Sequence, residues 1–255
     1  MKLGEVCERL DQELRTDAFA EIDGSPNGLQ VGASDQTVER AAFAVDAAQA
    51  TIDAAAEVGA DLLVVHHGLW WEGTERLTGR TYERVAALLE HDIALYVSHL
   101  PLDSHQEFGN AAQIGAELGL QEVKPFGSHG GEFIGQCGNS PTEASIDGLT
   151  TDLANAIDVS SDDIFTLSFG PTTIRSIAIV TGSGIDWLDE AVENGADALI
   201  TGEGKQVGYH AARESGIHVL LAGHYATETG GVRALASLVE EWGIESTFLD
   251  HPTGL

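Results

Sequence analysis

The chain has 255 residues, a length that fits one large domain or two modest ones. Its 41 Asp and Glu against 12 Lys and Arg give a formal net charge of −29. This charge argues against nucleic acid or an anionic membrane surface as a partner, because phosphate binding depends on Lys and Arg. The 43% of hydrophobic residues excludes global disorder, and no apolar run approaches the roughly 18 residues of a membrane span. Neither a disulfide framework nor a signal-peptide pattern is present, so we expect a cytoplasmic protein.

The acidic residues are dispersed along the chain, and no acidic run exceeds two residues. Lysine is rare, with Lys2, Lys124 and Lys205 as its three positions. A dispersed acidic surface with little lysine predicts adaptation to a cytosol of molar salt, where charges are screened over ~3 Å. An ordinary acidic protein is the alternative.

Hydrophobic spacing in the first half predicts alternating helices and strands. Apolar residues at helical spacing over 3–14 indicate an amphipathic helix. The elements expected next are a turn-rich segment at 23–32, a strand at 41–45, a helix at 47–58, a strand at 61–65, a helix at 82–90, a strand at 93–97 and a helix at 110–118. The continuous apolar run at 61–65 is typical of a buried parallel strand, and the βαβαβα order indicates an α/β fold.

The second half repeats the letters of the first. The segment GADLLVVHHG (59–68) resembles GADALITGEG (195–204), YERVAALLEHDIALYVSHLPLD (82–103) resembles YHAARESGIHVLLAGHYATE (209–228), and GNAAQIGAELGL (109–120) resembles GGVRALASLVEEWGI (230–244). We therefore predict two similar α/β halves related by internal duplication, at 1–124 and 125–255. Residues 125–172 are expected to join the halves, with a helix at 145–157.

Histidines and carboxylates follow the predicted strands at corresponding places in both halves: His66, His67, His99 and Asp103 in the first, and Glu203, His224 and Glu228 in the second. Ligands bind at the carboxyl ends of strands in open α/β sheets. The adjacent His66 and His67 side chains should diverge, so that each imidazole could serve a different metal ion. His224 and Glu228 are four residues apart and would share a helix face. The Pro before Asp103 should interrupt regular structure and let its carboxylate turn back.

Imidazole and carboxylate ligands suit Zn, Fe, Mn, Co or Ni. Two such ions would activate a water molecule and clamp a phosphate or carbonyl group. Alternatives remain open for single residues: Asp103 could cap a helix and Glu203 could be a surface acid. His210 could be a solvated helix residue or an acid–base group. The remaining histidines, expected at the surface or in loops, are His91, His105, His129, His218 and His251.

Three further side chains near these motifs have open roles. Trp70 and Trp71 could form a core or lid cluster, or a stacking surface for a ring. Lys205 could neutralise an anionic ligand or form a plain ion pair. The glycines at 181–184 and 201–208 lack the spacing of a nucleotide-binding loop.

The segments SPNGLQVG, GADLLVVHHG, SHLPLD, GADALITGEG and AGHYATETGGVRALA resemble the NIF-three-like family, often labelled GTP cyclohydrolase 1 type 2 homologues. The resemblance extends over residues 25–236. It implies two-domain α/β proteins that form toroidal hexamers, with a dinuclear metal site in the cleft between the domains. The family's ligand positions fall on His66, His67, Asp103, His224 and Glu228. His99, Glu203 and His210 fall near that site as candidates for catalysis or substrate contact.

The resemblance also implies a function. It indicates a hydrolase with two divalent ions per subunit (Fe, Zn, Mn, Co or Ni), in which an activated water attacks the purine C8 of GTP, opens the ring and releases formate. The expected partners are further copies of the chain and a small-molecule substrate, for which a nucleotide is a candidate. The alternatives are a non-enzymatic metal-handling or regulatory protein, and a scaffold in which the metals only stabilise the ring.

Overall fold

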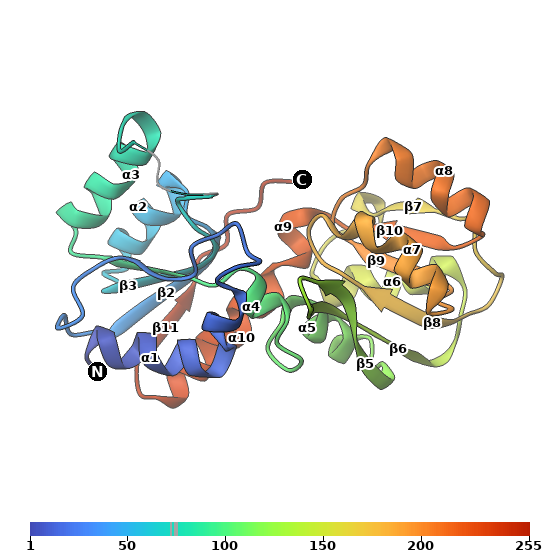
Figure 1. The fold of residues 1–255 in the computed structure, drawn as a ribbon, viewed down its shortest axis with the longest axis horizontal. Coiled ribbons are helices and arrows are strands. Elements are labelled where there is room, and N and C mark those ends of the chain that lie inside the picture. Colours follow the sequence, from blue (N-terminus) through green and yellow to red (C-terminus); the bar gives the residue numbers. More distant parts are fainter. Residues whose placement is uncertain (72, 74–75) are drawn as a thin grey trace. The chain divides into compact units, whose positions relative to one another are not determined.

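The computed structural model describes all residues except 72, 74 and 75. The chain forms two compact units, each built around one β-sheet (Figure 1). Unit 1 comprises Met1–Leu102 and Val232–His251, and unit 2 comprises Asp103–Gly231 and Pro252–Leu255. A mixed α/β fold with two sheets confirms the predicted fold class. The internal duplication stays a prediction.

Unit 1 is a five-stranded sheet with helices on both faces. Its strand order is β1-β4-β3-β2-β11, in which β2, β3, β4 and β11 run parallel and β1 is antiparallel to β4. The strands are β1 (Gly28–Val31), β2 (Arg40–Asp46), β3 (Leu62–His67), β4 (Ala94–Val97) and β11 (Glu245–Phe248), and the helices are α1 (Leu3–Leu14), η1 (Thr16–Phe19), α2 (Gln49–Glu57), α3 (Gly79–Glu90), α4 (Leu100–Asp103) and α10 (Thr229–Glu241).

The packing of unit 1 follows from its sequence pattern. The apolar positions of α1 are all buried, which confirms the predicted amphipathic helix. Strands β2, β3 and β4 are buried on both faces, as expected for parallel strands. One face packs against Ile52 and Ala55 of α2 and Leu88 of α3. On the other face, the Tyr96 hydroxyl donates to Asp11 Oδ1 of α1 at 2.8 Å.

Unit 2 is a six-stranded mixed sheet of order β5-β6-β8-β9-β10-β7. Its central strands β8, β9 and β10 are parallel, and the other pairs are antiparallel. The strands are β5 (Gln121–His129), β6 (Glu132–Ala144), β7 (Phe165–Leu167), β8 (Ile174–Ile179), β9 (Ala198–Thr201) and β10 (His218–Leu221), and the helices are α5 (Asn110–Glu117), α6 (Ile146–Ala156), η2 (Ser161–Asp163), η3 (Gly184–Trp187), α7 (Leu188–Glu193), α8 (Gln206–Ser215) and α9 (His224–Thr227).

The segment predicted to join the halves has more structure than expected. Strands β5 and β6 form a long antiparallel hairpin that turns at Gly130 and Gly131, both with positive φ. The predicted helix at 145–157 is confirmed as α6. The division into units also differs from the predicted boundary at Lys124. Strand β11 returns to pair with β2, which gives unit 1 a segment from the end of the chain.

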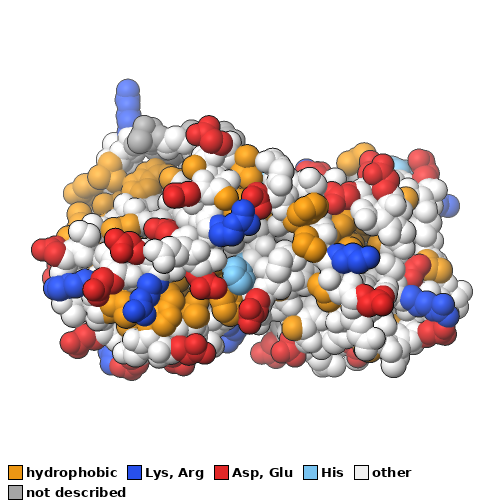
Figure 2. Space-filling model, turned by 60° about the horizontal axis from the view of Figure 1, so that its bottom comes forward, with side chains coloured by type: hydrophobic (Ala, Val, Ile, Leu, Met, Phe, Trp, Pro, Cys, Tyr) orange, Lys and Arg blue, Asp and Glu red, His pale blue; other side chains and the backbone are white. Residues whose placement is uncertain are grey.

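The surface agrees with the composition. Figure 2 shows Asp and Glu side chains scattered over the displayed face, without one dominant acidic patch. In the part of the chain that the structure describes, no helix is long and apolar enough to cross a membrane.

Candidate metal-binding residues

Three neighbouring parallel strands of unit 1 bring imidazoles and carboxylates to one sheet edge. Strands β2, β3 and β4 are parallel, so their carboxyl ends lie at the same edge. Asp46 ends β2 and pairs in register with His67 at the end of β3. His99 follows β4 after one residue. The prediction that His66, His67 and His99 lie at a strand edge therefore holds for this sheet.

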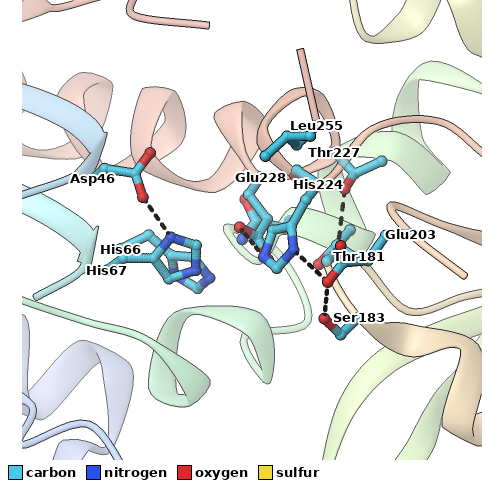
Figure 3. Close-up of polar contacts among 12 residues, drawn as sticks. Asp46, His66, His67, Thr181, Ser183, Glu203, His224, Thr227, Glu228 and Leu255 are labelled. Atoms are coloured by element: carbon cyan, nitrogen blue, oxygen red, sulfur yellow. Dashed lines mark hydrogen bonds and ion pairs between the residues drawn. The ribbon is translucent and has the colours of Figure 1, made fainter. Parts of the chain in front are cut away.

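The three imidazoles each donate from Nδ1 to an oxygen. His66 Nδ1 donates to the Ser98 carbonyl oxygen at 2.9 Å, and His67 Nδ1 donates to Asp46 Oδ1 at 2.9 Å, as Figure 3 shows. His99 Nδ1 donates to a carboxylate at 2.8 Å. A neutral imidazole that donates from Nδ1 carries its lone pair on Nε2, which is the form that binds a metal ion.

The rings of this set lie close together. Their potential ligand atoms all lie within 4.8 Å of one another, so His66, His67 and His99 could hold a metal ion. The ring centroids of His66 and His67 are 4.7 Å apart, so the expected divergence of these side chains is wrong. The reason is local: the Ser98 carbonyl and the Asp46 carboxylate orient the two rings at the end of the strand.

The carboxylate that holds His99 is Asp23, which the sequence motifs did not single out. Its side chain is 1% exposed, and it accepts hydrogen bonds from Ser25 N, Asn27 Nδ2 and Leu100 N in addition to His99. Burial opposes the carboxylate form, but the hydrogen bond and charge of His99 outweigh it and lower the pKa of Asp23. Asn27 Oδ1 also accepts from His99 N at 2.7 Å. The turn DGSPN was the sequence feature that could have pointed to Asp23, but the hydrogen-bond partner His99 lies more than 70 positions away.

Trp70 and Trp71 lie in two different environments. Trp70 packs against the core of unit 1. Trp71 is 42% exposed, and its ring meets the His99 ring edge-on at 4.9 Å between centroids. The core interpretation therefore describes Trp70, and a stacking role for Trp71 stays a prediction.

In unit 2, the loops after β8, β9 and β10 bring together Ser183, Glu203 and His224. Glu203 accepts a short hydrogen bond from the Ser183 hydroxyl. His224 Nδ1 donates to Glu203 Oε1 at 3.1 Å (Figure 3). Glu203 is thus a partner of His224 as well as a surface acid, since it remains exposed. Its pKa is lowered, first by the Ser183 hydrogen bond and then by His224, against the effect of burial.

His224 and Glu228 share one face of a short helix, as their spacing predicted. His224 Nε2 lies 3.2 Å from Glu228 Oε2, and Glu228 is 3% exposed. Burial opposes the imidazolium, but hydrogen bonds and charges from Glu228 and Glu203 raise the pKa of His224 to about 9. Carboxylates that favour a proton at this position also favour a cation.

Gly182 leaves the space that these two side chains occupy. Its φ of +56° lies in the left-handed region, and a Cβ there would overlap with Glu228 Oε1 and approach His224 Nε2 to 2.9 Å. Its carbonyl oxygen accepts from the backbone N–H groups of Gly202 and Glu203, both at 2.9 Å. A side chain at this position would therefore disturb the His224–Glu228 pair.

Asp103, the last residue of α4, is the first residue of unit 2 and is 7% exposed. It accepts from Asn110 Nδ2 at 2.8 Å and from Thr181 Oγ1 at 3.4 Å. The chain around Asp103 differs from the expectation: Leu100–Asp103 forms the short helix α4, in which Pro101 is tolerated because a first helical turn needs no N–H donor there.

Three other candidates have different surroundings. His210 is exposed on α8, and its ring meets the Tyr209 ring edge-on at 5.4 Å. Lys205 forms the plain ion pair, with Asp186 at 2.5 Å. His218 was expected at the surface but is 4% exposed, with its ring nitrogens at Gly170 N and the Pro171 carbonyl oxygen.

A family model described as Duf34/NIF3 (NGG1p interacting factor 3) matches residues 1–253. The chain belongs to the Duf34/NIF3 family. A Duf34/NIF3 relative from Halobacterium salinarum, named "GTP cyclohydrolase 1 type 2 homolog", is 53% identical over 255 residues and the whole of both chains. Relatives with the same name from Deinococcus radiodurans and Escherichia coli K12 are 42% and 38% identical, over 98% and 99% of this chain and 94% and 99% of theirs. The predicted resemblance is confirmed.

Solved structures resemble the whole chain in fold. The crystal structure of TTHA1606 from Thermus thermophilus has a TM-score of 0.90 and 36% identity over the whole of both chains. Reduced HcgD from Methanocaldococcus jannaschii has a TM-score of 0.85 and 25% identity over 98% of both chains. These similarities support the fold of the whole chain, and neither name states a reaction.

Proposed function

We propose that the protein is a hydrolase that uses two divalent metal ions, with His66, His67, Asp103, His224 and Glu228 as ligands. The observation that carries the proposal is the common hydrogen-bonding pattern of the unit 1 histidines, which fixes each in the tautomer that binds metal through Nε2. The family resemblance supports the joint assignment of all five residues. Mixed imidazole and carboxylate ligands favour Fe, Zn, Mn, Co or Ni.

When bound, such ions supply Lewis acidity, which lowers the pKa of water and polarises a carbonyl or phosphoryl oxygen. The residues of the chain do the rest. Asp23 and Asp46 hold His99 and His67 in fixed orientations. Glu203 holds Nδ1 of His224 and, through its exposed carboxylate, can accept or return a proton during the reaction.

His99 is a further candidate ligand beside these five, rather than an acid–base group. Its Nδ1–H is engaged by a buried carboxylate, and its ring lies 5.0 Å from that of His66 between centroids. The exposed His210 is retained only as a candidate for substrate contact. The relatives' shared name suggests a nucleotide-like substrate, and we extend that suggestion to this protein as part of the proposal.

The test combines metal analysis with a substrate screen on protein purified in molar salt. We expect two ions per chain and turnover of at least one phosphoester or nucleotide that is abolished by chelator. The variants His66→Ala and Glu228→Gln should each lose metal and turnover, whereas His91→Ala, at an exposed helix end, should keep both. Metal binding without turnover on a broad panel would overturn the hydrolase proposal, and metal that exchanges readily would then favour the metal-handling role.

We also propose that the protein assembles into a ring-shaped hexamer and works in a salt-rich cytoplasm. The family resemblance supports the first point, and the dispersed acidic surface supports the second. Light scattering in molar salt tests the assembly, and a monomeric mass at micromolar concentration would contradict it.

A further inference from the structure

Unit 1 contains a cavity of about 840 Å³, which lies within the range of small-molecule sites. It is lined by residues of η1, the turn at 23–27 and α3, together with Trp70, Gly73 and Leu77. Its apolar lining consists of Ala20, Pro26, Val31, Trp70, Leu77 and Val85. This lining suits an apolar or aromatic ring system.

The charge of the lining is unfavourable for phosphate. Asp17 and Asp23 line the cavity, and none of the described lining residues is Lys or Arg. Phosphate groups are bound by Arg, Lys, backbone N–H groups or metal ions. Because Asp17 is also exposed, an approaching polyanion meets a negative charge at the cavity.

The cavity shares its wall with the support of His99. Asp23 and Asn27 both line it, and both hold His99 through hydrogen bonds of 2.8 and 2.7 Å. A molecule in the cavity would therefore lie beside the residues that orient this imidazole. No step of the proposed hydrolase chemistry uses the cavity otherwise.

The polar side chains of the wall differ in whether they already have hydrogen-bond partners. Gln30 donates to Pro26 O and accepts from Leu69 N, so its amide is already used. Ser25 is 3% exposed and lines the cavity, yet its Oγ has no hydrogen-bond partner among residues 1–71, 73 and 76–255. A buried hydroxyl without a partner costs free energy, which a ligand group could recover.

We propose that this cavity binds an uncharged or cationic heteroaromatic molecule, such as a nucleoside without its phosphates, with a polar ring edge at Ser25. The statement that this molecule is the substrate rests on the proposed function, whereas the statement that the cavity binds it does not. It narrows the nucleotide-like substrate of the proposed function to a nucleoside and disfavours the triphosphate that the relatives' name suggests.

Guanosine and GTP are the matched probes, because they differ only in the triphosphate. Binding is measured by tryptophan fluorescence and calorimetry on the full chain in chelator and molar KCl, so that the metal site takes no part. We expect guanosine to bind at least tenfold more tightly than GTP. Ser25→Ala should weaken guanosine binding about fivefold, the loss of one hydrogen bond.

Two substitutions, one in η1 and one directly after it, test the location. Ala20 is exposed and lines the cavity, so Ala20→Trp should fill it and abolish guanosine binding. Ala18 is exposed on the same segment but does not line the cavity, so Ala18→Trp should bind guanosine normally. At 0.15 M KCl, where exposed charges are screened less, Asp17→Lys should improve GTP binding and leave guanosine binding unchanged.

Three results would overturn the proposal: no guanosine binding at millimolar concentration, GTP binding as tight as guanosine binding, or unchanged binding in Ala20→Trp. None of these concerns metal content or turnover, so failure here leaves the hydrolase proposal standing. A failed turnover screen, in turn, leaves the binding result valid.

Discussion

The buried carboxylate of Asp23 should be one of the most sensitive positions in unit 1. Oδ1 accepts from Ser25 N and His99 Nδ1, and Oδ2 accepts from Asn27 Nδ2 and Leu100 N. In Asp23→Asn, either orientation of the amide turns an NH2 group towards two donors. The substitution keeps the size of the side chain and changes only its hydrogen bonding and charge.

The magnitude follows from the number of bonds lost. A hydrogen bond to a charged group contributes ~1.5–3 kcal/mol, so two lost bonds cost about 3 kcal/mol or more. For a chain of this length, that free energy corresponds to a fall of roughly 6–12 °C in Tm. The matched control is Asp46→Asn, because Asp46 is 37% exposed and its one hydrogen bond to His67 can be replaced by water. Its cost should stay below about 1 kcal/mol.

Scanning calorimetry and urea unfolding of both variants, in chelator and molar salt, measure the difference without a contribution from metal. The reasoning is refuted if Asp23→Asn unfolds within about 1 kcal/mol of the parent protein, or if Asp46→Asn is equally destabilised. The first result would mean that solvent reaches Asp23 despite its 1% exposure, and the second would mean that burial does not set the cost of the lost hydrogen bonds.

Three further predictions concern metal affinity, thiol reactivity and salt. Gly182→Ala should weaken metal binding at least tenfold in a calorimetric titration, because the new Cβ displaces Glu228. Gly195→Ala is the control, since Gly195 also has a positive φ but has open space around it, and it should bind metal normally. Equal losses in both variants would attribute the effect to backbone strain. Burial, with Asp11 nearby, raises the pKa of Cys7 to about 11 from an ordinary 9.0, so at pH 8 its thiolate fraction is about 100-fold lower than that of an ordinary thiol. Burial also raises the pKa of Cys137, but this residue is only half-buried, so iodoacetamide should label Cys137 first. Rapid labelling of Cys7 would contradict this. Because the thiol is neutral in the folded state, its burial also costs stability as pH rises from 9 to 11. Raising KCl from 0.15 M to 2 M should raise Tm, since salt screens the self-repulsion of 29 net negative charges, and an unchanged Tm would argue against the halophilic interpretation.

The parts of the fold that were predictable have strong local patterns. Helix α1 has its apolar residues at helical spacing, and all of them are buried. The pairing of His224 with Glu228 follows from a separation of four residues within one helix. In both cases the sequence contains the whole physical cause, because the interacting groups are neighbours along the chain.

The missed features depend on contacts between distant residues. The β5–β6 hairpin has mostly exposed residues in Gln121–Pro125, so it offers no buried alternating pattern. His218 is buried because Gly170 and Pro171 lie against it, some 48 positions away. Asp23 acts on His99 across 76 positions. Neither the composition nor the hydrophobic periodicity of the sequence predicts these long-range hydrogen bonds.

The net charge and the local charge of a site have different consequences in salt. At molar ionic strength the Debye length is ~3 Å, so the many surface acids of this protein scarcely repel an anion that approaches from solution. Buried and partly buried groups are screened much less. The negative charge of Asp23, whose side chain is 1% exposed, therefore still repels an anionic ligand in the unit 1 cavity at a salt concentration that screens the surface charges. If the cavity disfavours triphosphates, guanosine should still bind more tightly than GTP in molar KCl. If the net charge is the cause, this difference in affinity should shrink as the salt concentration rises.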